Sequence, residues 1–372
     1  MASFHDFGLL KSLQQTLKES AFATPTEIQS KAIPLLLAGK SLVGVAETGS
    51  GKTMAYALPI LHLLKQQEND GDKVRDEGTP RALIVVPTRE LGEQVSRVFK
   101  TFTHTTRLRV RTILGGTKLQ VAKENVKGQF EVLVATPGRL VQMLMRRQID
   151  LEQTRTLIFD EADQMLDPGF MAEATKIVSA CPQTLQIALF SATVSADVQK
   201  LMTELVPDAE IIRTKGSSRV VATLQTENLK VLNGKRFPLL ETLMKNAVTG
   251  GTLIFTNTRE QCDALAKDMV KKGVACVIYR GEMDKIERRN NLKAFREGKV
   301  QWLISTDLAS RGLDVEHVGR VINYHMPQHL ENYLHRAGRT ARAGRAGRVI
   351  NFVTERDQEI MELVKSVKAM PS

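Results

Sequence analysis

The stretch Ala46-Glu47-Thr48-Gly49-Ser50-Gly51-Lys52-Thr53 has the residue types and the spacing of a phosphate-binding loop. Glycines let backbone N–H groups turn toward phosphate oxygens, and a helix that follows adds its positive end. In such loops the lysine reaches the β- and γ-phosphates, and the hydroxyl that follows it ligates Mg²⁺. The stretch therefore predicts a nucleotide site, although Ala46 stands where the strict pattern has glycine. A chance glycine-rich turn is the alternative.

A second candidate is Asp160-Glu161-Ala162-Asp163, which directly follows the apolar run 156–159. A phosphate loop needs a further carboxylate for its metal ion, at the end of a neighbouring buried strand. Asp160 suits Mg²⁺ coordination, and Glu161 suits orienting or deprotonating an attacking water. Three acids among four residues are usually a solvated loop. Their place after an apolar strand favours the functional interpretation.

Short aliphatic runs that alternate with amphipathic stretches must position these groups. We expect strands in the first half at residues 42–45, 82–86, 109–114, 131–135, 156–159 and 186–190. The pattern restarts with strands at 252–256, 275–279, 301–305, 320–324 and 349–353, and with a helix at 260–272. Buried strands between helices predict parallel sheets. We therefore expect two α/β domains, at 1–215 and 223–372, with a linker at 216–222 and a charged surface loop at 66–80.

Composition narrows the class of protein. The chain has 372 residues with 42% hydrophobic content, enough for two cores. It shows no transmembrane window and no leader, and its three cysteines are far apart, so a cytoplasmic protein is expected. The seven histidines form no ligand-spaced cluster, and no heptads are visible, so we expect no zinc site and a monomer.

The net charge of +11 is spread unevenly. Residues 1–215 carry 26 basic and 24 acidic side chains, whereas residues 216–372 carry 26 and 17. A basic half beside a near-neutral half indicates a polyanionic partner, most simply a nucleic acid. Added solubility is the alternative on charge alone.

The ordered set of motifs resembles the DEAD-box family of ATP-dependent RNA helicases over nearly the whole chain. Besides the two stretches above, it comprises F-A-T-P-T-E-I-Q from Phe22, P-T-R-E-L from Pro87, Gly115-Gly116, Thr136-Pro137-Gly138-Arg139, Ser191-Ala192-Thr193, Ser305-Thr306-Asp307, Arg311-Gly312-Leu313-Asp314 and His335–Arg348. The resemblance implies two tandem recombinase-like (P-loop NTPase) domains, each a mostly parallel sheet flanked by helices, with the active cleft between them. It also implies ATP and Mg²⁺ as cofactors and RNA as the partner.

The resemblance implies a nucleotide site with contributions from both domains. Gln29 matches the residue that reads adenine and Phe22 the ring that stacks on it, although a helix start with a core aromatic residue is the alternative. The implied metal ligands are Thr53 and Asp160. The implied catalytic residues are Lys52, Asp160, Glu161, Arg339 and Arg342. The implied nucleotide contacts are Phe22, Thr24, Gln29, Ala46, Glu47, Thr48, Gly49, Ser50, Gly51, Lys52, Thr53, Gly312 and Asp314.

The resemblance also implies RNA contacts at strand ends, where backbone N–H groups, hydroxyls and arginines bind phosphates without reading bases. Arg280 and Lys285 depart from the histidine and glutamine that family members commonly carry there. The implied RNA contacts are Pro87, Thr88, Arg89, Gly115, Gly116, Thr136, Pro137, Gly138, Arg139, Thr258, Arg259, Arg280, Gly281, Arg288 and Thr306. Residues implied to couple nucleotide state to closure are Asp163, Ser191, Thr193, His335 and Arg336.

The stretch His335–Arg348 holds five arginines, one at every third residue. We expect a helix over 330–342, on which Arg336, Arg339 and Arg342 fan over one side toward the cleft. By resemblance, Arg339 and Arg342 contact the γ-phosphate. Arg345 and Arg348 fall outside the family pattern and are expected to be a solvated surface.

The sequence therefore predicts an RNA-stimulated ATPase that closes on ATP and RNA and unwinds short duplexes locally or remodels RNA–protein complexes. A DNA-directed motor, a non-enzymatic RNA clamp and an ATPase acting on proteins are the alternatives. No Arg/Gly-rich or basic extension is visible that would select one RNA.

Overall fold

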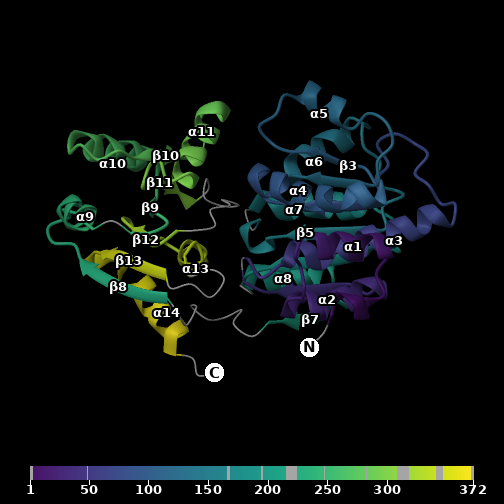
Figure 1. Ribbon diagram of the computed structural model, residues 1–372, viewed down its shortest axis with the longest axis horizontal. Coiled ribbons are helices and arrows are strands. Elements are labelled where there is room, and N and C mark those ends of the chain that lie inside the picture. The colour runs from purple at the N-terminus through teal and green to yellow at the C-terminus, as the bar shows by residue number, and fades with distance from the viewer. Residues whose placement is uncertain are drawn as a thin grey trace. The chain divides into compact units, whose positions relative to one another are not determined.

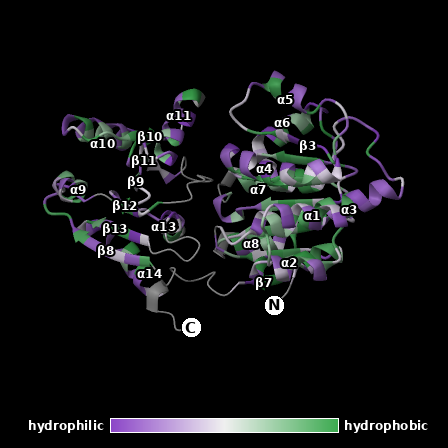
Figure 2. Ribbon diagram, in the orientation of Figure 1, coloured by the Kyte–Doolittle hydropathy of each residue, from purple (hydrophilic) through white to green (hydrophobic). Residues whose placement is uncertain are grey.

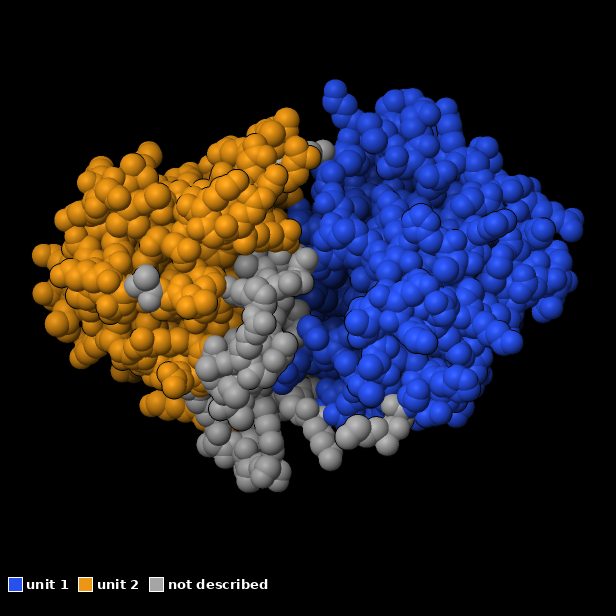
Figure 3. Space-filling view, in the orientation of Figure 1, with its two compact units in different colours: residues 1–217 blue, residues 218–372 orange. Residues whose placement is uncertain are grey.

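Figure 3 shows the chain as two compact units, Met1–Ser217 and Ser218–Ser372. The computed structural model describes residues 3–47, 49–165, 168–193, 196–214, 224–246, 248–281, 283–307, 318–340 and 347–369. The predicted linker, 216–222, lies outside the described residues. The domain limits read from the sequence therefore stay a prediction.

The first unit is built on a parallel sheet. Its described residues form seven strands in the order β3-β4-β2-β5-β6-β1-β7, and every adjacent pair is parallel. The strands are β1 (Leu42–Val45), β2 (Ala82–Val85), β3 (Val110–Ile113), β4 (Val132–Ala135), β5 (Thr156–Asp160), β6 (Gln186–Ser191) and β7 (Glu210–Arg213).

Helices cover both faces of this sheet (Figure 1). One face packs against α1 (Lys11–Glu19), α2 (Glu27–Leu37), α3 (Lys52–Asn69) and α4 (Arg89–Thr106). The other face packs against α5 (Leu119–Asn125), α6 (Pro137–Met145), α7 (Pro168–Ser179) and α8 (Ala196–Leu205). Two 3-10 turns, η1 (Phe4–Phe7) and η2 (Ala162–Gln164), complete the described elements of the unit.

The second unit repeats this plan with six described strands in the order β10-β11-β9-β12-β13-β8, all paired in parallel. They are β8 (Leu224–Lys230), β9 (Thr252–Thr256), β10 (Val277–Tyr279), β11 (Trp302–Thr306), β12 (Arg320–Asn323) and β13 (Gly347–Val353). One face packs against α9 (Phe237–Met244) and α10 (Arg259–Lys271). The other packs against α11 (Lys285–Arg296), α13 (Leu330–Ala337) and α14 (Gln358–Ala369), with the turn η3 (Glu355–Asp357) before α14.

Successive strand residues alternate between the two clusters on either face. Val43 and Val45 belong to one cluster and Leu42 to the other, and Phe255 and Ile254 alternate in the same way. Because both faces are covered, the central strands are apolar runs, and green predominates in the middle of the first sheet in Figure 2. The predicted α/β class with two parallel-sheet domains is thus confirmed. The active cleft between the domains stays a prediction.

Two strands were missed by the sequence pattern, and both lie at a sheet edge. In β7 only Ile212 is buried, and no residue of β8 is fully buried. Without burial on both faces, these strands lack the apolar run by which the others were recognised. The surface loop expected at 66–80 is confirmed for residues 70–77, which form no helix or strand and are exposed except for Val74. It is wrong for residues 66–69, because α3 continues to Asn69. Asp72 in this stretch pairs with Arg81 at 2.8 Å and also with Arg155.

Among the described residues, no helix combines the length and the apolar character that a membrane span requires.

The closeness of β1 to β6 gives a test of the packing beneath the phosphate loop. A Cβ atom at Gly44 would lie 2.7 Å from the ring of Phe190, which is fully buried. We expect Gly44→Ala to lower the free energy of unfolding of the first unit by about 1–3 kcal/mol, as overpacked cores do. Denaturant unfolding measures this. Gly169→Ala is the control, since Gly169 lies in α7 with open space around it. Equal stability of the two variants would contradict the packing argument.

Candidate nucleotide and nucleic-acid site

The strand order of the first unit divides the predicted site residues into two neighbouring groups. Since all strands are parallel, their carboxyl ends lie at one edge of the sheet. The phosphate loop, the Ser191 segment and the acidic stretch follow β1, β6 and β5, which are adjacent. The three segments predicted to contact RNA follow β2, β3 and β4, which are also adjacent. The acidic strand β5 pairs with both β6 and β2, so it lies where the two groups meet.

The lysine of the phosphate loop is hydrogen-bonded to carbonyl oxygens at the start of the same loop. Lys52 begins α3 and is buried, and its Nζ donates to the carbonyl oxygens of Ala46 at 2.6 Å and Glu47 at 3.2 Å. The Ser50 hydroxyl donates to the same Glu47 carbonyl at 2.7 Å. Gly51 caps the helix with φ 93°, a conformation that favours glycine. Thr48 lies outside the described residues.

Gln29 fastens this loop to α2. Its Oε1 accepts a hydrogen bond from the Thr26 backbone N–H at 2.9 Å, and its Nε2 donates to the Gly51 carbonyl at 3.1 Å. A Cβ atom at Gly51 would lie 2.4 Å from that Nε2, so only glycine fits. Gln29 is buried, while Phe22 is 44% exposed and Thr24 is also exposed. The structure therefore joins Gln29 to the phosphate loop and leaves the Phe22 ring accessible.

Asp160 is buried at the end of β5 and is held by two hydrogen bonds. The Tyr56 hydroxyl donates to its Oδ2 at 2.7 Å, and the Glu161 backbone N–H donates to its Oδ1 at 3.0 Å. Burial, and then the nearby Glu161, raise the pKa of Asp160 to about 6, while Lys52 and the Tyr56 hydrogen bond act in the opposite direction. Burial and Asp160 also raise the pKa of the Tyr56 hydroxyl well above its usual value.

Glu161 follows in a left-handed conformation, with φ 55°, and its carboxylate accepts a hydrogen bond from Gln164. Left-handed backbone is uncommon outside glycine and is often retained at functional sites. It turns the chain sharply after β5, so that Asp160 and Glu161 are both buried at the strand end.

The residues present fit Mg²⁺, which binds hard oxygen ligands and usually takes one or two carboxylates together with substrate phosphates. Thr53 and Asp160 interact with the same Tyr56 hydroxyl, so the two predicted ligands lie close together. Within the described ranges, no cluster of three or more His, Cys, Asp or Glu side chains could hold a metal by itself. The phosphates of a bound nucleotide and water would have to supply the remaining ligands.

Asp163 is linked to the segment that follows β6. Its Oδ2 accepts hydrogen bonds from the Ala192 N–H at 3.1 Å, the Thr193 N–H at 3.0 Å and the Thr193 hydroxyl at 3.1 Å. The Ser191 hydroxyl instead donates to the Thr193 carbonyl at 2.7 Å. One carboxylate thus connects the ends of β5 and β6.

The other group of strand ends also shows ordered contacts. Thr88 caps α4, and its hydroxyl accepts from the Leu91 N–H at 3.2 Å. The Gly115 N–H donates to the Thr136 hydroxyl at 2.9 Å, which ties the end of β3 to the end of β4. Arg139 donates to the Thr117 carbonyl at 2.6 Å. Pro137 and Gly138 open α6, Gly116 has φ 73°, and Arg89 pairs with Glu93 at 2.8 Å.

In the second unit the predicted RNA residues follow β9, β10 and β11, which are adjacent in the sheet. Thr258 caps α10, with Arg259 as its first residue, and Thr306 ends β11. Arg280 pairs with Asp263 at 2.8 Å and donates to the carbonyl of Gly281 at 3.3 Å. Arg288 lies over the Tyr279 ring at 5.5 Å. Lys285 is the first residue of α11.

The expectation that Arg336 shares one exposed helix face with Arg339 and Arg342 is wrong. The helix α13 ends at Ala337, short of residue 342, and Arg336 is buried inside the second unit. Its guanidinium donates to Asp307 at 2.5 and 2.7 Å, to Asn323 at 3.1 Å, to Asn257 at 2.9 Å and to the His325 carbonyl at 2.7 Å. All five N–H groups therefore serve the unit itself, and Arg336 does not fan outward.

The arginines that follow Arg336 lie beyond the end of its helix, whereas His335 shares that helix. Arg339 follows the Gly338 cap and is buried, while His335 lies in the last turn of α13. Arg348 belongs to β13, is half exposed and pairs with Glu227. Arg342, Arg345, Gly312 and Asp314 lie outside the described residues.

The chain is similar to known proteins over most of its length. The model of the DEAD/DEAH box helicase family matches residues 26–201, and that of the helicase conserved C-terminal domain matches residues 235–344. The ATP-dependent RNA helicase CshA of Listeria monocytogenes is 34% identical over 98% of this chain and 68% of its own length. The chain belongs to the DEAD-box family of ATP-dependent RNA helicases.

Further relatives of this DEAD-box protein include RhpA of Helicobacter pylori, a DEAD-box ATP-dependent RNA helicase that is 35% identical over 98% of this chain and 72% of its own. Among solved structures, S. cerevisiae Dbp5 bound to RNA and ADP BeF3 matches with a TM-score of 0.87 and 27% identity. That match covers 100% of this chain and 95% of the other.

The sequence interpretation of this DEAD-box protein missed Tyr56, Asn257 and Asn323. Tyr56 stands four residues after Lys52, on the same side of the helix, so its spacing could have indicated it. Asn323 ends the apolar strand β12, and a polar residue within a buried run indicates a specific partner. Asn257 gave no such signal.

The Tyr56 hydroxyl provides the first test of this site. Tyr56→Phe leaves the Asp160 Oδ2 without its donor, which costs about 1–3 kcal/mol of stability for a buried acceptor. Because that hydrogen bond lowers the pKa of Asp160, the pKa rises in the variant. The ionised form is then reached only at higher pH, so the acid limb of the ATPase pH profile moves upward. Tyr333→Phe, which also removes a buried hydroxyl, is the control and leaves the limb in place. If the acid limb of Tyr56→Phe did not move, the Tyr56 hydrogen bond would not control the ionisation of Asp160.

Arg336 provides the second test. Arg336→Lys keeps the charge but cannot donate to four partners from one planar group. Because Asp307 is then left poorly paired, we expect a loss of about 3–5 kcal/mol in the free energy of unfolding of the second unit. The control is Arg348→Lys, since the half-exposed pair with Glu227 contributes about 0–1 kcal/mol. Thermal unfolding of both variants decides, and equal losses would contradict the hydrogen-bond assignment.

Proposed function

We propose that the chain is an RNA-stimulated ATPase that couples hydrolysis to closure of its two domains and to local, non-processive unwinding of RNA duplexes or remodelling of RNA–protein complexes. The observation that carries the proposal is the position of β5, whose acidic end lies between the phosphate-loop group and the group of predicted RNA segments. A change at the bound nucleotide that moved the acidic end of β5 would therefore act directly beside β2, whose end carries a predicted RNA segment.

Each acidic residue has a separate role in this proposal. Bound Mg²⁺ would neutralise charge on the β- and γ-phosphate oxygens. Thr53 and Asp160 would hold it, and Lys52 would leave the loop carbonyls to meet the phosphates. Glu161 would orient the attacking water and accept its proton. Asp163 would pass the change to the Ser191–Thr193 segment through its three hydrogen bonds.

The second domain would supply the arginines that stabilise charge on the γ-phosphate. Arg339 and Arg342 fit this role in the family pattern, and such arginines raise rates by about 10³–10⁵ in nucleotide hydrolases. Arg336 stabilises the strand ends from which this segment leaves, rather than reaching the nucleotide itself. Gly312 and Asp314 would contact the nucleotide, and His335 would couple the two sites.

The RNA segments offer hydroxyls, backbone N–H groups and arginines, so binding with little sequence preference is expected. Bending a bound strand would disfavour a duplex, and stacking averages about 1.4 kcal/mol per step in DNA. Distorting a few steps would therefore open a short duplex without tracking. RNA bound to Dbp5 and the names of the relatives support this substrate.

A monomer in the cytoplasm is part of the same proposal. The three cysteines are free thiols, and burial raises the pKa of Cys181 and Cys262 to about 12. They are thus protonated and weakly reactive at neutral pH, as expected of a reducing compartment.

Glu161→Gln tests the proposal. The variant keeps the shape and loses the base, so we expect RNA-stimulated ATP turnover to fall by about 10²–10⁴ while nucleotide binding remains. Glu152→Gln, which changes an exposed acid, is the control and retains turnover. Turnover is measured with single-stranded RNA, with DNA of equal length and without nucleic acid.

The outcomes separate the alternatives. Unchanged turnover in Glu161→Gln would remove the hydrolytic role and favour an RNA clamp. Equal stimulation by DNA would favour a DNA motor, and no stimulation by either would favour an ATPase that acts on proteins.

A further inference from the structure

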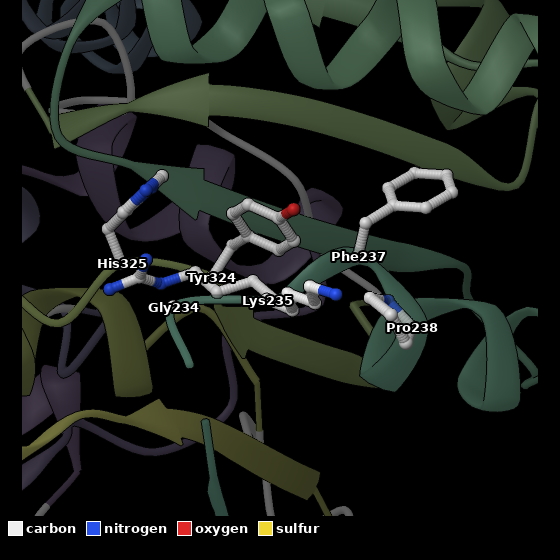
Figure 4. Close-up of a pocket in the computed structure, with 7 residues that line it drawn as sticks. Gly234, Lys235, Phe237, Pro238, Tyr324 and His325 are labelled. Carbon is white, nitrogen blue, oxygen red and sulfur yellow. The ribbon is translucent and has the colours of Figure 1, made fainter. Parts of the chain in front are cut away.

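A cavity of about 360 Å³ in the second unit contains none of the residues discussed as nucleotide or RNA contacts (Figure 4). It is formed where the chain passes from β8 to α9 and where it leaves β12. Its lining residues are Gly234, Lys235, Arg236, Phe237, Pro238, Tyr324 and His325. The volume lies in the range of small-ligand clefts.

The cavity is basic, with Lys235 and Arg236 in its wall and no acidic residue among those that line it. Two of its polar atoms are buried without a hydrogen-bond partner among the described residues, Arg236 Nε and His325 Nδ1. Buried polar atoms are nearly always paired, so a ligand that reached these two atoms after a small side-chain movement would supply the partners that they lack. The Arg236 Nε can only donate, which requires an acceptor such as a phosphate oxygen.

His325 contributes a neutral hydrogen-bonding group. Burial, followed by Arg236 and Arg336, lowers the pKa of His325 to about 4, although Asp357 acts in the opposite direction. The imidazole is therefore uncharged at neutral pH, and its Nδ1 can pair with a polar edge of a ligand.

Aromatic rings form the rest of the wall. Tyr324 is fixed between His325, at 5.1 Å between ring centroids, and Phe352, at 5.6 Å. Figure 4 draws His325, Tyr324, Lys235 and Phe237 among the lining side chains, with the Tyr324 ring between His325 and Phe237 in this view. Fixed rings beside cations are the combination with which proteins hold a base and its phosphate.

The wall is also connected to the proposed RNA site. The His325 N–H donates to the Phe255 carbonyl at 3.2 Å, and the Met326 carbonyl accepts from Asn257 at 2.9 Å. Asn257 directly precedes Thr258 and Arg259, and Met326 directly follows His325, so this hydrogen bond joins the neighbours of the cavity wall and of that predicted RNA segment.

We propose that this cavity binds one nucleotide unit, with its phosphate against Arg236 and Lys235 and its base against Tyr324. The proposal rests on the proposed function for its ligand class, and the unit could come from an RNA strand or from a free mononucleotide. An acidic peptide would satisfy the two cations but would make less use of the fixed ring.

Photo-crosslinking of the full chain tests the site. The probes are a single-stranded RNA carrying 4-thiouridine and free 4-thiouridine monophosphate, each with a non-hydrolysable ATP analogue in excess to fill the ATP site. We expect cross-links in peptides that contain Tyr324 or Phe237. A strand source gives them with the RNA alone, and a mononucleotide source gives them with both probes.

The paired variants Lys235→Ala/Arg236→Ala and Lys267→Ala/Lys271→Ala supply matched changes of charge, the second on the exposed side of α10. The first pair is expected to lose the cross-links. If the source is the strand, the log–log salt dependence of RNA affinity should also become shallower by about 0.7 for each phosphate that the variant no longer binds. The second pair should keep both the cross-links and the salt dependence.

The remaining outcomes separate failure of the cavity site from failure of the proposed function. Cross-links elsewhere but not beside Tyr324 or Phe237, with RNA-stimulated turnover intact, would refute the cavity site and leave the proposed function standing. No cross-link with either nucleotide probe, together with direct binding of poly-glutamate that is lost in Lys235→Ala/Arg236→Ala, would refute the nucleotide site and mark a protein-docking surface. Loss of RNA stimulation alone would count against the proposed function, while a mononucleotide cross-link would still support the cavity.

Discussion

The parallel pairing of the strands is the constraint on which the sites depend. Every described pair in both sheets is parallel, so each strand of a unit ends at the same edge. Polar residues far apart in the sequence, such as Lys52, Asp160 and Thr193, are thereby brought together without any dedicated scaffold. Because all strands end at one edge, the strand order determines which loops are neighbours there. Because β5 lies between β6 and β2, the acidic stretch borders both groups of loops.

Charge burial at that edge has a cost that local hydrogen bonds offset. Asp160 is surrounded by apolar strands, and burial is the largest cause of its raised pKa. Donation from Tyr56 and from the Glu161 backbone keeps the carboxylate oriented rather than fully stabilised. A carboxylate held in this state gains from any cation that arrives. In the proposed function, a bound nucleotide and its metal ion would supply the rest of the stabilisation.

The central strands, and the placing of polar motifs at their ends, could be predicted from the sequence, because both depend on local residue patterns. Apolar runs such as 156–159 need only burial on two faces to be recognised. It failed where a contact depends on tertiary structure. The edge strand β8 has no buried run, and α13 ends at Ala337, with Gly338 as its C-cap residue, before the arginine pattern is complete. Spacing of three residues predicted one arginine face, yet the direction of each side chain depends on where the helix stops.

Arg336 shows how a charged residue within a predicted catalytic stretch can serve the fold itself. Asn228, Asn351 and Asn323 are hydrogen-bonded in series at 2.8 Å across β8, β13 and β12, and Asn323 accepts from Arg336. Through Asn257 and Asp307 the same guanidinium reaches the ends of β9 and β11. Buried polar networks of this kind are rigid when every member is paired. Arg336 thus holds together the ends of β9, β11 and β12. Its charge is used inside the second unit, where it stabilises the strand ends.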